Sequence, residues 1–120
     1  MEFIGLLIMV FLILLYVRQM KPGKNIKQIT TSELKKHLGD TSKQFIDVRT
    51  PGEFKGSRIK GFKNIPLHTL QKNMDKLSKE KEIIVICQSG MRSAKAGKIL
   101  SSSGFQSVVN VRGGMNAWSE

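Results

Sequence analysis

The stretch Ile83-Ile84-Val85-Ile86 constrains the fold of this chain more than any other feature. Such an unbroken run of β-branched residues is typical of a central strand in a parallel sheet, where helices cover both faces. Candidate strands at 27–29, 44–48, 64–66 and 107–111 alternate with segments of helical pattern. Strands that alternate with helices predict βαβ units, right-handed crossovers and a parallel sheet. The sequence therefore predicts an α/β protein.

The segments between these strands carry helical signals. Thr30 and Glu33 form a capping-box pattern, which predicts a short helix through Leu38. Leucine and methionine recur at intervals of three and four residues over 67–77, which predicts one amphipathic helix. Further helical turns are expected after Pro51, at 93–100 and just before Trp118.

The N-terminus carries an unbroken apolar run of fifteen residues, from Phe3 to Val17. We interpret residues 1–20 as a transmembrane anchor, 21–25 as a linker and 26–120 as one modest domain, which is all that 120 residues allow. As a helix the run would span roughly 23 Å, short of a hydrocarbon core of ~30 Å. Snorkelling basic side chains after the run would make up the difference.

Two alternatives to an anchor are less favoured. A signal peptide would have positive charge before the run and small residues after it, but Glu2 precedes the run and 17–20 (VRQM) follows it. A buried core helix would show polar positions at helical spacing, and the run has none. Basic residues lie only on the C-terminal side, which predicts a single-pass protein of the cell membrane with its soluble domain facing the cytoplasm. A single cysteine agrees with a reducing compartment.

The net charge of +11 extends over the whole chain: residues 1–27 contribute +3 (four basic, one acidic) and 28–120 the remaining +8. Such a surface would attract anionic lipid headgroups or small anions. Nucleic acid is not an expected partner, because the lysines are scattered and a single Trp and a single Tyr offer no run of stacking aromatics.

The segment 87–93 (CQSGMRS) follows the central strand, at the carboxyl edge where sites form in parallel sheets. A loop that curls around Cys87 into a helix would point backbone N–H groups at the thiol and lower its pKa below ~8.5. Gly90 permits a positive φ there, and Arg92 adds a charged fork suited to an oxyanion. A structural buried cysteine is the alternative, but Gly90 and Arg92 at this spacing favour a reactive one.

Three ordered motifs resemble the rhodanese family of sulfurtransferases, and most closely its small bacterial single-domain members with an N-terminal membrane helix. They are 47–54 (DVRTPGEF) continuing through 59–66 (IKGFKNIP), 87–92 (CQSGMR) and 113–118 (GGMNAW). The resemblance covers roughly residues 26–119. It implies a rhodanese-like five-stranded parallel sheet with helices on both faces.

The resemblance also implies thiosulfate sulfurtransferase activity. The thiolate of Cys87 would attack the outer sulfur of a small anionic donor such as thiosulfate, giving a persulfide and sulfite. A cyanide, thiol or protein sulfur acceptor would then remove that sulfur. No metal or organic cofactor is implied. The residues implied to hold the persulfide and the donor are Gln88, Ser89, Gly90, Met91 and Arg92.

Several nearby residues are assigned supporting roles or none. We interpret Asp47 and Arg49 as a pair that ties the loop to the sheet. The chain has Ser57-Arg58 where the family commonly has Gly-His, and Arg58 could add a positive group near the pocket that changes donor preference. His37 and His68 are expected on the surface, away from the loop.

Two other functions compete with sulfur transfer. A related phosphatase loop needs five residues between Cys and Arg to cradle a phosphoryl group, whereas this chain has four, 88–91. A non-catalytic, membrane-tethered binding module is the second competitor. The combination of Cys, Gly and Arg in a loop of this length favours catalysis over it.

Overall fold

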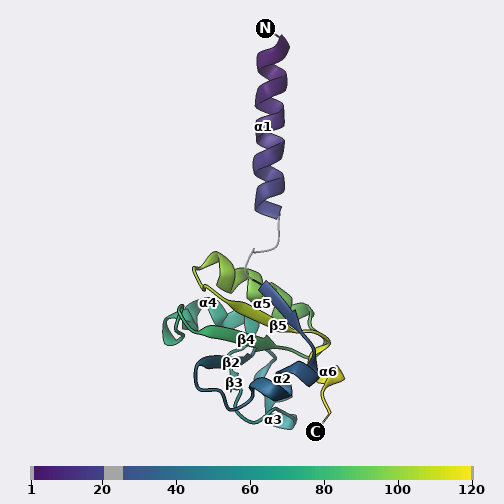
Figure 1. Cartoon of the computed structure of the whole chain (residues 1–120), viewed down its shortest axis with the longest axis vertical. Helices are drawn as coiled ribbons and strands as arrows, with labels where there is room; N and C mark the ends of the chain where they lie inside the picture. Colours follow the sequence, from purple (N-terminus) through teal and green to yellow (C-terminus); the bar gives the residue numbers. More distant parts are fainter. Residues whose placement is uncertain (1, 21–25, 120) are drawn as a thin grey trace.

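The computed structural model describes residues 2–20 and 26–119 (Figure 1). The linker predicted at 21–25 lies outside the described residues. Five strands form one sheet in the order β1-β5-β4-β2-β3, and every neighbouring pair is parallel. The strands are β1 (Ile26–Ile29), β2 (Lys43–Asp47), β3 (Lys63–Asn64), β4 (Glu82–Ile86) and β5 (Val108–Val111).

Strand β4 is the middle strand of the sheet, as the β-branched run predicts. Ile83, Ile84, Val85 and Ile86 are all 0% exposed, so both faces of the strand are covered. Ile83 and Val85 face one apolar core, and Ile84 and Ile86 face another. The predicted α/β class with five parallel strands is therefore confirmed.

Helices lie on both faces of the sheet (Figure 1). One core is closed by the long helix α5 (Met91–Ser102) and by α4 (Leu70–Asn73), and the other by α2 (Thr31–His37), α3 (Pro51–Gly56) and α6 (Gly114–Ala117). The capping box predicted at the start of α2 is present, because the Thr30 hydroxyl accepts from the Glu33 N–H and the Glu33 carboxylate accepts from Thr30.

The single amphipathic helix predicted over 67–77 is wrong in its continuity. The segment consists of the 3-10 turn η1 (Leu67–Thr69), α4, and a second 3-10 turn η2 (Met74–Lys76). The Asn73 side-chain amide donates to the Thr69 carbonyl at 2.8 Å, and the Thr69 hydroxyl donates to the Pro66 carbonyl at 3.0 Å. These side chains compete with the backbone for helix hydrogen bonds. The apolar spacing still points inward, since Leu70 is 0% exposed.

The N-terminal segment forms helix α1 (Glu2–Met20), drawn in purple in Figure 1. Across residues 2–20 and 26–119, no helix has both the length and the apolar character that crossing a bilayer requires. The predicted transmembrane anchor is therefore wrong. The predictions that depended on it, a single-pass membrane location, a cytoplasm-facing orientation and contact with lipid, are wrong as well. The physical reason is length, because fifteen apolar residues give roughly 23 Å of helix against a core of ~30 Å.

Candidate active site

Cys87 is the first residue after β4, at the carboxyl edge of the sheet. It is 0% exposed and belongs to the core that α5 closes. Gly90 has a φ of +102°, which turns the loop back so that its N–H donates to the Cys87 Sγ at 3.0 Å. The Ser93 Oγ lies 3.3 Å from the same sulfur. The thiol is thus enclosed by the loop, as predicted from 87–93.

Two opposing effects act on the pKa of the Cys87 thiol. Burial raises the pKa, whereas the hydroxyl and N–H of Ser93 and the N–H groups of Gly90 and Ser89 lower it by stabilising the thiolate. The net result is a pKa below the ordinary value for cysteine. The loop therefore favours the nucleophilic form of the sulfur.

Helix α6 supports the loop from behind. The N–H of Met115 donates to the Cys87 carbonyl at 2.9 Å, and the N–H of Asn116 donates to the Gln88 carbonyl at 2.9 Å. Gly114 lies so close that a Cβ there would collide with the Cys87 carbonyl oxygen, and its φ is +56°. Only glycine fits this position without moving the loop.

Arg92 forms a bidentate ion pair with Glu53. Its two terminal nitrogens lie 2.6 and 2.9 Å from the two carboxylate oxygens. Glu53 also closes a second capping box, with Thr50, at the start of α3. The contact with Arg92 and the hydrogen bonds with Thr50 lower the pKa of the Glu53 carboxyl to about 2, against the opposing effect of burial. The fork predicted to steer the donor is therefore already engaged by a carboxylate of this chain.

Asp47 and Arg49 form a buried ion pair beside the loop. The Arg49 Nη2 lies 2.8 Å from the Asp47 Oδ2, and the two side chains are 2% and 1% exposed. The Arg49 Nη1 also donates to the Gln88 Oε1 at 3.3 Å, so the pair reaches the loop directly. The Gln88 Nε2 in turn donates to Asn116 on α6 at 2.6 Å.

Other sequence-predicted residues lie at the margin of the site. The Arg58 guanidinium lies 5.2 Å from the centre of the Phe54 ring, where it stacks on α3 and lies outside the loop. Met91 is 79% exposed, so its side chain does not enclose the thiol. His37 lines a separate hollow with Lys43 and Glu82, well away from the loop in sequence and structure.

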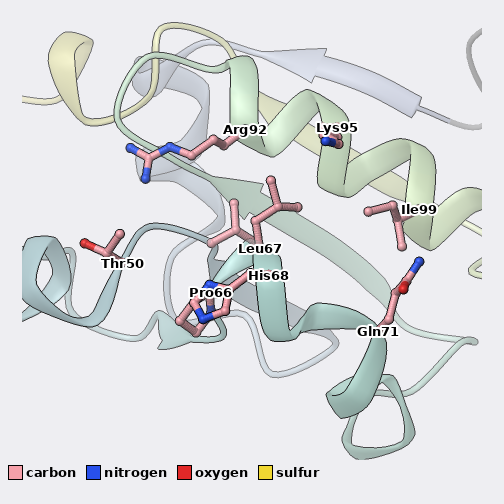
Figure 2. A pocket seen from close by; sticks show the side chains of 9 residues that line it. Thr50, Pro66, Leu67, His68, Gln71, Arg92, Lys95 and Ile99 are labelled. Carbon is pink, nitrogen blue, oxygen red and sulfur yellow. The ribbon is translucent and has the colours of Figure 1, made fainter.

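A cavity of about 440 Å³ opens beside the loop, between α5 and the segment after β3 (Figure 2). Figure 2 shows Arg92, Lys95 and Ile99 along α5 and, across from them, Leu67 and His68. His68 is exposed, as expected, but it lines this cavity together with Arg92. The remaining lining residues are Val48, Thr50, Pro66 and Gln71.

Sequence reasoning missed the roles of three side chains in and around the site, namely Ser93, Asn110 and Glu53. Ser93 donates from its hydroxyl to the Oδ1 of Asn110, and the Nδ2 of Asn110 donates to the Oε1 of Gln28 at 3.0 Å. The signal for Asn110 was present, because it is a polar residue within an otherwise apolar strand. Glu53 gave no such signal, since its contact with Arg92 joins residues that are 39 positions apart.

The parallel sheet and the thiol enclosed at its carboxyl edge define an α/β protein with a single-cysteine loop. Residues 30–120 match the model of the Rhodanese-like domain, so the chain belongs to the rhodanese-like domain family. The family predicted from the three motifs is confirmed. Its membrane-anchored subtype is not.

Relatives of this chain include sulfurtransferases. A sulfurtransferase from Allochromatium vinosum is 32% identical over 94 residues, which are 78% of this chain and 88% of that protein. YtwF of Bacillus subtilis is 40% identical over 94 residues, 78% of this chain and 90% of that protein. The crystal structure of a rhodanese-like domain protein from Staphylococcus aureus has a TM-score of 0.72 and 39% identity, over 78% of this chain and 92% of that one.

Proposed function

We propose that this protein is a sulfurtransferase that carries sulfane sulfur from an anionic donor, such as thiosulfate, to a thiophilic acceptor as a persulfide on Cys87. The observation that carries the proposal is the enclosure of the Cys87 sulfur by the Gly90 N–H and the Ser93 hydroxyl. These donors favour a thiolate and, after reaction, the negative charge of a persulfide.

The chemistry balances in two displacements. The Cys87 thiolate attacks the outer sulfur of thiosulfate, an S–S bond forms to Cys87, and sulfite leaves with the electron pair of the broken bond. A thiolate or cyanide then attacks the outer sulfur of the persulfide, and Cys87 leaves again as a thiolate. The N–H groups of the loop would hold the transferred sulfur between the two steps.

The cavity beside the loop supports an approach route for the second substrate. It joins an apolar floor, which includes Leu67 and Ile99, to the ammonium group of Lys95. An organic thiol with an anionic group would match that combination of surfaces. We propose this class of thiol as an acceptor, alongside cyanide and protein thiols.

The test is the intact mass of the full chain after incubation with thiosulfate. We expect an increment of one sulfur atom on the wild type, no increment on Cys87→Ala, and loss of the increment when a thiol acceptor is added. If the mass of the wild type does not change with thiosulfate or with an organic persulfide donor, the proposal is wrong.

A non-catalytic binding module is the alternative, and the burial of Cys87 with the pairing of Arg92 to Glu53 favours it. It predicts an unmodified mass under all donors. A phosphatase is disfavoured because only four residues separate Cys87 from Arg92. Steady hydrolysis of an aryl phosphate by the wild type, lost in Cys87→Ser, would support that function instead.

A further inference from the structure

A chain of polar side chains runs from the Cys87 sulfur to the surface of the edge strand. The Ser93 hydroxyl lies 3.3 Å from the sulfur and donates to the Asn110 Oδ1, and the Asn110 Nδ2 donates to the Gln28 Oε1 at 3.0 Å. Gln28 on β1 pairs with Asn110 on β5 in the sheet register. Ser93 and Asn110 are 0% and 4% exposed, whereas Gln28 is exposed.

The Ser93 hydroxyl has one hydrogen and three acceptors within reach. These are the Cys87 sulfur, the Asn110 Oδ1 and the Gly90 carbonyl, the last at 3.1 Å. The Gly90 carbonyl already receives the Ala94 N–H at 3.1 Å, so it does not depend on the hydroxyl. The sulfur and the Asn110 oxygen therefore compete for a single hydrogen.

The protonation state of Cys87 decides which of them receives it. A thiol can donate its own hydrogen to the Ser93 Oγ, which leaves the serine hydrogen for the Asn110 Oδ1. Each acceptor in the series then receives a hydrogen bond. A thiolate can only accept, so the serine hydrogen must turn to the sulfur. The Asn110 Oδ1 would then be buried without a donor, which is unfavourable.

A half-turn of the Asn110 amide removes this conflict. The turn exchanges Oδ1 and Nδ2, so that Nδ2 donates to the Ser93 Oγ and Oδ1 accepts from the Nε2 of a turned Gln28. Gln28 is exposed and has room to turn. The turned Oδ1 would face the Gly90 carbonyl, now 3.5 Å from Nδ2, and that contact opposes the change unless a thiolate drives it.

We propose that this chain of hydrogen bonds reverses its direction when Cys87 loses its proton, with Asn110 as the positioning residue that aims the Ser93 hydroxyl at the sulfur. The inference rests on the proposed function, because sulfur transfer cycles Cys87 through a thiolate. Gln28 is the last residue in this series of hydrogen bonds. It therefore influences the pKa of the Cys87 thiol without contacting it.

Charged groups near the two ends of the chain must be separated from this effect. Arg92, paired with Glu53, and the Asp47–Arg49 pair lie on the elements around the thiol. Lys27, Glu33, His37, Lys43 and Glu82 share a hollow with Gln28. None of these groups is altered in the experiment.

The experiment measures the pKa of Cys87 from the pH dependence of its alkylation by iodoacetamide, a neutral reagent, in the full chain. In Gln28→Glu the carboxylate can only accept a hydrogen bond from Asn110. It therefore holds the series of hydrogen bonds in the direction that suits a thiol and should raise the pKa of Cys87. Gln28→Lys can only donate, so it should lower the pKa. We expect a shift of about one unit in each direction, a tenfold change in the thiolate-to-thiol ratio.

The same two substitutions in a Ser93→Ala background provide the control. The new charge at position 28 remains there but the hydrogen-bonded link to the sulfur is cut, so we expect each shift to fall to the small direct electrostatic effect of that charge. Equal shifts in the two backgrounds, or no shift in the wild-type background, would overturn the inference. Because alkylation uses no sulfur donor, this result is independent of whether the chain transfers sulfur.

A second measurement covers the case in which Ser93→Ala does not fold. The side-chain amide signals of Asn110, followed by NMR in the unaltered chain, should move with the titration of Cys87 and stay fixed in Cys87→Ala. Asn110 signals that remain fixed while Cys87 titrates would overturn the reversal.

Discussion

Replacement of Glu53 by glutamine isolates the charge of the ion pair with Arg92. A glutamine keeps a side-chain oxygen that can accept from Thr50, so the capping box at the start of α3 is retained. What the variant loses is the carboxylate that the two terminal nitrogens of Arg92 contact at 2.6 and 2.9 Å. The effect on stability follows from the shift in the pKa of Glu53.

The pKa of Glu53 falls from 4.5 to about 2 in the folded protein. A difference of about 2.5 units corresponds to about 3.4 kcal/mol, at 1.36 kcal/mol per unit. The side chains of Arg92 and Glu53 are 36% and 33% exposed, so solvent screens a large part of this energy. We expect Glu53→Gln to lower the free energy of unfolding by about 1–2 kcal/mol at pH 7.

The sign of the pH dependence follows from the lowered pKa. A carboxyl group that is more acidic when folded stabilises the protein fully above its unfolded pKa, near 4.5, and loses this contribution as the pH falls toward 2. The gap between wild type and Glu53→Gln in urea unfolding should therefore close between pH 4.5 and pH 2.

Glu33→Gln is the matched control, because Glu33 closes the same kind of capping box with Thr30. This variant also removes one carboxylate from the third residue of a capping box, but in α2 instead of α3. Because no basic side chain forms an ion pair with Glu33 among the described residues, we expect Glu33→Gln to lower the free energy of unfolding at pH 7 by less than Glu53→Gln does. A gap for Glu53→Gln that stays constant from pH 7 to pH 2 would refute the ion-pair reasoning.

Three further predictions concern the loop, the buried ion pair and the cavity. Gly114→Ala should slow persulfide formation by ~10²-fold, measured by mass spectrometry over time, because its methyl group displaces the loop carbonyl. Asp47→Ala should lower the free energy of unfolding by about 3–5 kcal/mol in urea, because Arg49 stays buried without its partner. Lys95→Gln should raise the KM for an anionic thiol acceptor but not for a neutral one. Lys98→Gln, on the same helix outside the cavity lining, should change neither value.

The strands of the fold were predictable from the sequence because their signals are local. The β-branched run at 83–86 and the polar-to-apolar changes around it define β4 without any knowledge of distant contacts. The prediction of one helix over 67–77 was wrong because the side chains of Thr69 and Asn73 donate to backbone carbonyls. Apolar spacing does not reveal such hydrogen bonds.

The residues of the site likewise comprise some that local sequence predicts and others that it does not. Cys87, Gly90 and Arg92 lie within six residues, so their proximity was predictable from the loop alone. The contact between Arg92 and Glu53 and the link from Ser93 to Asn110 depend on the packing of α3 and β5 against α5. Such contacts need the register of the sheet, which a single sequence does not specify.

The N-terminal error had a different cause. The apolar run has no polar breaks, but its helical length falls short of a bilayer core, and the expected snorkelling of basic side chains does not make up the difference. Glu2 and Arg18 limit the run at both ends, so neighbouring residues could not extend it. The length of the helix, calculated from its rise per residue, predicted correctly that it does not span a membrane, whereas its hydropathy did not.

The contact of α6 with the Cys87 loop has a consequence for the order in which the parts of the domain are completed. A ribosome makes α6 after all five strands, so the sheet and Cys87 emerge before the backbone donors of Met115 and Asn116. A nascent or truncated chain that ends before Gly114 would hold the thiol without the support behind its loop. The enclosure of the Cys87 thiol is therefore completed only after translation has passed α6.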